Sequence, residues 1–254
     1  MKVLLFVLLS VESILTRDIH FDYFVFTQQW PPAVCIEGQK TGHQCSIPTN
    51  VKGWVIHGLW PSRNMNRGPF FCNNSDTFDE NKLKPIEEEL RLYWPNLFSD
   101  SPDLSFWKHE WKKHGTCSLS DKLIPDEFTY FKTALNLYKK YNITSILGNS
   151  GIIPNTYTSY KSDDFCNAVE NSLNTVPVVT CIYDKISTHH YLLQIEICVD
   201  KDFNTIDCPE RSSGHHSNKY TLYYKTKQDD SCARCSSNKG IWYPPITSYN
   251  VNHG

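Results

Sequence analysis

The sequence has no long hydrophobic run beyond its N-terminus, no marked excess of charge and no internal repeat. Because no later stretch is apolar and long enough to cross a bilayer, a helical membrane protein is not expected. The formal net charge of −2 argues against binding polyanions over a broad basic surface. No Gly/Ser-rich linker divides the 254 residues, so the sequence predicts one large domain.

The N-terminal segment is the hydrophobic exception. A lysine precedes a short apolar run from Val3 to Leu9, and small residues follow. Such a run is too short to span a membrane and is typical of a secretory signal peptide. We therefore expect a signal peptide over 1–13 and a single folded domain over 14–254.

Cysteine is abundant. Ten cysteines would be unusual in a reducing compartment and fit one where disulfides form. Sequons for N-glycosylation stand at Asn73 and Asn142 and agree with passage through the secretory pathway. We expect a disulfide-stabilised glycoprotein.

Helices and strands are predicted in separate blocks. Four segments are rich in β-branched and aromatic residues and are interpreted as strands: 21–30, 53–60, 176–184 and 190–200. Two segments carry apolar residues at helical spacing: 83–93 and 128–138. Since the two kinds of element do not alternate regularly, we expect an α+β fold with a central antiparallel β-sheet flanked by helices.

The segment "FWKHEWKKHGTCS" at 106–118 has the residue types of a chemical site. On a helix that advances about 100° per residue, four ionisable groups share one side: His109, Glu110, Lys113 and His114. A solvated face would explain the lysine and the glutamate well. It explains two histidines close to tryptophans poorly, so a catalytic role is favoured.

A metal site is the first alternative. A zinc-binding helix of the HExxH type needs histidines at i and i+4 so that both point at one ion. His109 and His114 are five residues apart, and "CARC" at 232–235 has no matching second pair. We therefore expect neither a metal nor another cofactor.

A further histidine, His57, ends the predicted strand in "WVIHGLWP". Transesterification of RNA needs one neutral imidazole to remove the proton of the ribose 2′-OH and one imidazolium to protonate the departing 5′-oxygen. A lysine and another histidine can neutralise the charge that grows on the phosphoryl oxygens. The nucleophile belongs to the substrate, so this chemistry requires no metal.

"HGLWP" at 57–61 together with "FWKHEWKKHGTC" at 106–117 resembles the two active-site segments of the ribonuclease T2 family. The resemblance extends to "FVFTQQWPPAVC", "YWPNLF", "QIEICVD" and "WYPP", and is greatest to animal secreted or lysosomal members. It implies a disulfide-stabilised ribonuclease T2-like fold, a destination outside the cell or in the lysosome, and an endoribonuclease with an acidic pH optimum. The expected products are 2′,3′-cyclic phosphates and then 3′-phosphates, from a monomer that does not cleave DNA.

The same resemblance implies roles for the catalytic residues. His57 is expected to donate a proton and His114 to accept one, although the sequence alone does not orient the substrate between them. Glu110 and Lys113 would support the transition state, and His109 would hold phosphate. Glu110 is also expected to favour a charged imidazole beside it.

Base-binding positions follow from the resemblance too. One nucleobase pocket would be formed by four residues: Gln29, Asn96, Phe98 and Phe106. Trp60 would be an aromatic wall of the other pocket. Because stacking tolerates any base, we expect broad cleavage of single-stranded RNA. Ser62 stands where many members have aspartate, so an inherited base preference is not expected.

The disulfide pairing is also implied by the family. Four pairs match it: Cys35–Cys45, Cys72–Cys117, Cys181–Cys235 and Cys198–Cys208. Cys166 and Cys232 are left for a further bridge. Exchange of the two CxxC cysteines, which would pair Cys181 with Cys232 and Cys166 with Cys235, is the alternative.

Overall fold

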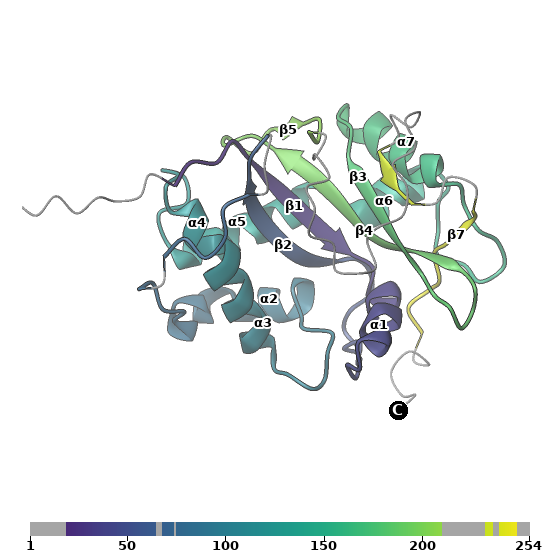
Figure 1. Ribbon diagram of the computed structural model, residues 1–254, viewed down its shortest axis with the longest axis horizontal. Coiled ribbons are helices and arrows are strands. Elements are labelled where there is room, and N and C mark those ends of the chain that lie inside the picture. The colour runs from purple at the N-terminus through teal and green to yellow at the C-terminus, as the bar shows by residue number, and fades with distance from the viewer. Residues whose placement is uncertain (1–18, 65–67, 74, 210–231, 236–238, 248–254) are drawn as a thin grey trace, which may run out of the picture.

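A β-sheet crosses the centre of the computed structural model (Figure 1), which describes residues 19–64, 68–73, 75–209, 232–235 and 239–247. Its four long strands are antiparallel to their neighbours and lie in this order: β2 (Val55–Ser62), β1 (Tyr23–Gln29), β4 (His190–Val199) and β3 (Val178–Tyr183). The four strands predicted from the sequence are therefore confirmed, with ends shifted by at most two residues.

Three two-residue strands complete the sheet. β5 (Thr205–Ile206) is antiparallel to β4, whereas β6 (Ala233–Arg234) and β7 (Ile241–Trp242) run parallel to β3 and β4. The sheet is thus mixed rather than purely antiparallel. Strands this short have no alternating pattern, so the sequence could not have predicted them.

Helices surround this sheet: α1 (Pro31–Lys40), the 3₁₀ segment η1 (Glu80–Ile86), α2 (Glu87–Tyr93), α3 (Asp103–Glu110), the π-helical segment η2 (Trp111–Gly115), α4 (Thr116–Ser118), α5 (Glu127–Lys140), α6 (Ile143–Asn149) and α7 (Ser162–Leu173). Figure 1 shows α2, α3, α4 and α5 gathered on the side of β2, with α6 and α7 beside β3. The fold is the α+β arrangement predicted from the sequence.

Local sequence explains where these helices begin and break. Asp126 caps α5 by accepting a 2.8 Å hydrogen bond from the backbone nitrogen of Thr129. The predicted helix over 83–93 is instead a 3₁₀ segment followed by α2, because Pro85 lies inside it and has no N–H to donate.

The two faces of the sheet differ in character. Alternate residues of β1 and β4, such as Phe24, Phe26 and Ile195, are fully buried in the main core with the helices. The opposite face carries a small apolar cluster of Tyr23, Val25 and Cys198, against which Trp60 packs. Beyond this cluster the second face carries polar side chains, so it can hold a functional site.

Two irregularities in the pairing interrupt the alternation of side chains. The partners of Thr27 and Gln28 on β2 are Gly58 and Ile56, which leaves His57 as the extra residue of a bulge. A second shift leaves Leu193 as the extra residue on β4. Because a bulge re-aims the side chains beside it, these two positions decide where His57 and Gln194 point.

All ten cysteines are paired. The five disulfides are those predicted from the sequence, including the further bridge: Cys35–Cys45, Cys72–Cys117, Cys166–Cys232, Cys181–Cys235 and Cys198–Cys208. The alternative exchange between Cys232 and Cys235 is not formed. Two of the bridges attach the short strand β6 to α7 and β3.

Within the residues that the structure describes, no helix combines the length and the apolar character needed to cross a membrane. The expected signal peptide over 1–13 lies outside the described residues.

Candidate active site

Trp60 on β2 lies between two of the predicted catalytic histidines. Its ring centroid is 5.0 Å from that of His57 and 5.3 Å from that of His114. Its indole nitrogen donates a 2.9 Å hydrogen bond to Oε2 of Glu110. A strand and a helical region, 50 residues apart in sequence where Trp60 bonds Glu110, thus bring three predicted catalytic residues around one indole ring.

The close approach at this point requires glycine. A β-carbon on Gly58 would overlap both the Trp60 indole nitrogen and the Glu110 carboxylate. The same holds at Gly115, where a β-carbon would overlap the ring of Trp111. Both glycines therefore allow the side chains around the site to pack closely against the backbone.

The helix that carries the histidines changes its winding at the site. α3 ends at Glu110, and residues 111–115 form a π-helical segment. The regular helix expected over 106–114 is therefore wrong beyond Glu110, where π-helical winding sets the positions of Lys113 and His114. Trp111 is buried in the core, and π-helical turns inside helices occur often at functional sites.

His57 is held from two sides. Its Nδ1 lies 3.0 Å from Oε1 of Gln194, and its carbonyl oxygen accepts a 3.1 Å hydrogen bond from the Trp94 indole. Burial lowers the pKa of His57 below its ordinary value of 6.5. The bond to Gln194 and the charge of Glu196 oppose that lowering of the pKa, because both favour the imidazolium.

Burial acts in opposite directions on Glu110 and His114. Glu110 is 2 % exposed, and desolvation raises its pKa to about 7, against the smaller effects of the Trp60 hydrogen bond and Lys113. Desolvation lowers the pKa of His114 to about 2, and the neighbouring positive charge of Lys113 acts in the same direction. Desolvation, rather than Glu110, therefore sets the direction of the pKa shift of His114.

His109 and Lys113 lie at the edge of this group. His109 is exposed on α3, and desolvation and Lys113 together lower its pKa. The Lys113 ammonium lies 5.9 Å from the ring centroid of Phe70, and that ring meets His114 edge-on at 5.6 Å. A cationic border of this kind can receive an anionic group without an extended basic surface.

Two of the predicted base-pocket residues adjoin His57. The ring of Phe106 lies 6.3 Å from the His57 ring. Gln29 is the cross-strand neighbour of Gln194, which bonds His57. Phe106 therefore lies next to His57, and Gln29 lies next to the residue that bonds His57.

Phe98 and Asn96 stand on the loop before α3. Phe98 is partly buried and stacks on His43, with ring centroids 4.6 Å apart and planes 13° apart. The side-chain nitrogen of Asn96 donates 2.9 Å hydrogen bonds to the carbonyl and hydroxyl oxygens of Ser101, and its side-chain oxygen accepts from Phe98. The amide of Asn96 thus shapes the loop that carries Phe98.

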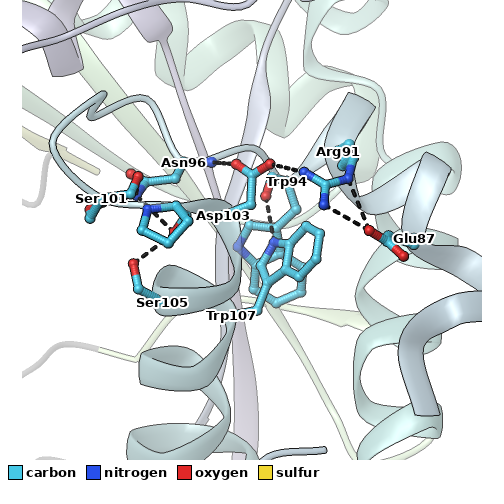
Figure 2. A network of polar contacts seen from close by, with 9 residues as sticks. Glu87, Arg91, Trp94, Asn96, Ser101, Asp103, Ser105 and Trp107 are labelled. Carbon is cyan, nitrogen blue, oxygen red and sulfur yellow. Dashed lines mark hydrogen bonds and ion pairs between the residues drawn. The ribbon is translucent and has the colours of Figure 1, made fainter. Parts of the chain in front are cut away.

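Figure 2 shows how this loop is fixed to the helices. Asp103, the first residue of α3, accepts hydrogen bonds from the Asn96 backbone at 2.7 Å and from Arg91 at 2.8 Å. The buried Trp107 donates to the carbonyl oxygen of Trp94 over 2.8 Å. These contacts hold α3, and with it Glu110, at a defined position beside β2.

Ser62 and the asparagines of the two expected glycosylation sites make local hydrogen bonds. Ser62 is buried and donates to the carbonyl oxygen of Trp60. The side-chain oxygen of Asn73 accepts a hydrogen bond from the backbone nitrogen of Ser75. That of Asn142 accepts one from the backbone nitrogen of Ser145 in the first turn of α6. Among the described residues, no group of three or more histidine, cysteine and acidic side chains is arranged to hold a metal ion.

Sequence reasoning missed Gln194 and Phe70. The signal for Gln194 was present, since Gln194 and Glu196 are polar residues two apart in an apolar strand and so share one face. Phe70 is 44 % exposed beside His114, but a phenylalanine two residues before a disulfide cysteine gives no sign of that neighbour.

Comparison with known proteins identifies a family. The model of the Ribonuclease T2 family matches residues 21–208, which contain every one of the predicted catalytic and base-pocket residues. Ribonuclease Oy of Magallana gigas is 40 % identical over 232 residues, which are 91 % of this chain and 99 % of that protein.

Solved structures are similar over most of the chain. The crystal structure of RNase NT in complex with 5′-AMP has a TM-score of 0.71 at 31 % identity, and covers 89 % of this chain and 100 % of its own. Human RNase T2 has a TM-score of 0.68 at 28 % identity, with coverages of 89 % and 99 %.

Proposed function

This chain belongs to the ribonuclease T2 family and is an endoribonuclease, and we propose that it cleaves single-stranded RNA by transesterification without a metal. The observation that carries this proposal is the arrangement around Trp60, which places two histidines and a buried carboxyl group together. The ribose 2′-oxygen attacks phosphorus, and the bond from phosphorus to the 5′-oxygen breaks. The products are a 2′,3′-cyclic phosphate and a free 5′-hydroxyl, and slow hydrolysis then gives a 3′-phosphate.

The two histidines divide the proton transfers. His114 takes the proton of the 2′-OH, because burial lowers its pKa and so favours the neutral imidazole, the form that can accept a proton. His57 gives a proton to the 5′-oxygen, since its bond to Gln194 and the charge of Glu196 support the imidazolium. This division agrees with the donor and acceptor roles implied by the family resemblance.

Glu110 acts as a neutral acid in this scheme. With a pKa of about 7, it holds a proton at acidic pH and can donate a hydrogen bond to a phosphoryl oxygen while accepting one from Trp60. A carboxylic acid kept neutral by its apolar surroundings donates in this way in other enzymes. Lys113 and His109 supply positive charge at the edge of the site, where they stabilise the transition state and hold phosphate.

Base recognition is broad in this proposal. We assign the first base pocket to Phe98 and Asn96 on the loop before α3, Phe106 on α3 and Gln29 on β1, and Trp60 supplies a wall for the second base. Stacking accepts any base but requires that it be unstacked from its neighbours, which favours single strands. Duplex regions are cleaved poorly, and DNA remains intact because it lacks the 2′-OH.

The cellular setting follows from the same features. A proton donor with a lowered pKa and a neutral Glu110 both favour an acidic optimum, as in a lysosome or an acidic extracellular space. The signal peptide over 1–13, glycosylation at Asn73 and Asn142, and a monomeric single domain over 14–254 complete the proposal.

The test uses one oligonucleotide in three forms: RNA, DNA, and RNA with a single 2′-O-methyl group at the cut site. We expect cleavage of the RNA alone, with cyclic phosphate ends, and no loss of rate in excess EDTA. Cleavage at the methylated position would show that the protein supplies its own nucleophile. Loss of activity in EDTA with rescue by zinc would show that a metal activates water.

A further inference from the structure

A chain of two side chains on β4 reaches His57 from outside the group of residues described as catalytic. Oε1 of Gln194 lies 3.0 Å from Nδ1 of His57, and Nε2 of Gln194 donates to Oε1 of Glu196 over 3.1 Å. Glu196 is 3 % exposed, on the polar face of the sheet. His57 and Gln194 belong to β2 and β4, so their bond passes over β1, which lies between those strands.

The order of atoms in this chain fixes the tautomer of His57. A carboxylate oxygen of Glu196 only accepts, so the amide of Gln194 must turn its nitrogen toward Glu196 and its oxygen toward His57. An acceptor opposite Nδ1 requires a proton on Nδ1. The other ring nitrogen, Nε2, is then the one that carries the transferable proton or the lone pair.

We propose that Glu196, acting through Gln194, is a positioning residue that keeps a proton on Nδ1 of His57 and leaves Nε2 as the atom that exchanges a proton with the substrate. The proposal rests on the catalytic role given to His57 above. Gln194 orients the ring directly, and Glu196 prevents the amide of Gln194 from turning over.

The backbone supports this chain of contacts. Both His57 and Gln194 adjoin bulged positions, at which the pairing shifts between Thr27 and Gln28 on β1 and between Thr180 and Cys181 on β3. These shifts re-aim the side chains so that they meet above β1.

Other charged groups around His57 must be considered for any pH dependence. Lys113 on η2 and His109 on α3 both disfavour the imidazolium of His57, and His114 interacts with His57 as a like charge when both are protonated. Gln194 and Glu196 are the groups that favour it. Removing either of them should therefore lower the pKa of His57.

The experiment compares Glu196→Gln and Gln194→Leu with the wild-type enzyme and with His57→Ala. We expect both variants to lower kcat/KM on an RNA dinucleotide by about 10- to 100-fold, a typical cost when an outer partner that orients a reactive imidazole is lost. The alkaline limb of the pH profile of kcat/KM should move to lower pH. Gln28→Leu is the matched control, because Gln28 is a neighbouring sheet glutamine that bonds Tyr141 on the other face.

A readout independent of activity is the ¹⁵N spectrum of the imidazole. In the wild-type protein Nδ1 of His57 should be protonated and Nε2 unprotonated at neutral pH, and Glu196→Gln should mix the two tautomers. An unchanged tautomer and a wild-type pH profile in both variants, with His57→Ala inactive, would overturn the positioning role alone. A fall in activity equal to that of Gln28→Leu, with no pH shift, would also overturn it. Full activity in His57→Ala would instead contradict the proposed function.

Discussion

The indole nitrogen of Trp60 donates a hydrogen bond to the buried carboxyl group of Glu110, joining β2, which carries one active-site segment, to α3, which carries the other. Burial gives Glu110 a pKa of about 7, so the group that receives this bond is neutral in acid. We therefore predict that Glu110→Gln, which keeps a donor and an acceptor, retains at least about ten times the activity of Glu110→Ala at pH 5. Loss of one such donor typically costs about 10²- to 10³-fold in kcat.

The comparison is made by steady-state kinetics on a dinucleotide, with melting curves to show that both variants fold. If Glu110 acted as a carboxylate base, Glu110→Gln would be as inactive as Glu110→Ala.

The pH profile should have its optimum on the acidic side. His114 must be neutral and His57 protonated, and the pKa of His114 is about 2 while that of His57 lies below 6.5. Activity is therefore lost as the pH rises through the pKa of His57, and then further as Glu110 ionises near pH 7. Measured kcat/KM from pH 3 to 9 checks this; a rate still rising above pH 8 would contradict it.

Substitution of the histidines should separate their roles. His57→Ala and His114→Ala remove a proton donor and an acceptor, so each should lower kcat by about 10²- to 10⁴-fold. His109 is exposed at the edge, so His109→Ala should raise KM more than it lowers kcat. Single-turnover rates at saturating RNA distinguish these effects, and a loss below tenfold in either of the first two variants would reassign its role.

A buried carboxyl group away from the site makes stability depend on pH. The side chain of Glu127 is buried, accepts from the backbone of Asp79, and has a pKa raised by burial to about 7. A raised pKa means that the folded state binds the proton more tightly, so this stabilisation is full below pH 4.5 and is lost as the pH rises to about 7. Glu127→Gln cannot ionise and should gain on the order of 2 kcal/mol relative to wild type between pH 4.5 and 8.

Urea unfolding at several pH values measures the difference between the two proteins. Parallel stability curves for wild type and Glu127→Gln would show that Glu127 does not change its protonation on folding.

Two disulfides close loops of different length, so their contributions to stability through chain entropy can be compared. Cys72–Cys117 spans 45 residues and Cys198–Cys208 spans 10, and each joins one buried cysteine to a partly buried one. Replacing both cysteines of a pair by serine should cost about 4 kcal/mol for the longer loop and about 3 kcal/mol for the shorter. Denaturant unfolding of the two double variants checks the order, and a larger loss at Cys198–Cys208 would reverse it.

The sequence predicted much of the site because its segments carry chemistry at recognisable spacing. His57 beside Trp60, and Glu110 with His114 in a histidine-rich helix, were found without coordinates. The regular 3.6-residue helix assumed beyond Glu110 was wrong, because a π-helical segment depends on how Trp111 and Gly115 pack rather than on helical propensity.

By itself, then, the sequence determined the four long strands, the helical regions around 83–93, 106–110 and 128–138, the family and the catalytic residue types, since each depends on local pattern or on contiguous motifs. Only the tertiary structure decided the protonation states of the catalytic residues and their hydrogen-bond partners. Burial raises the pKa of Glu110 and lowers that of His114, and burial is set by residues distant in the chain. The contact of Gln194 with His57 likewise exists only because two bulged strands pass their side chains over a third.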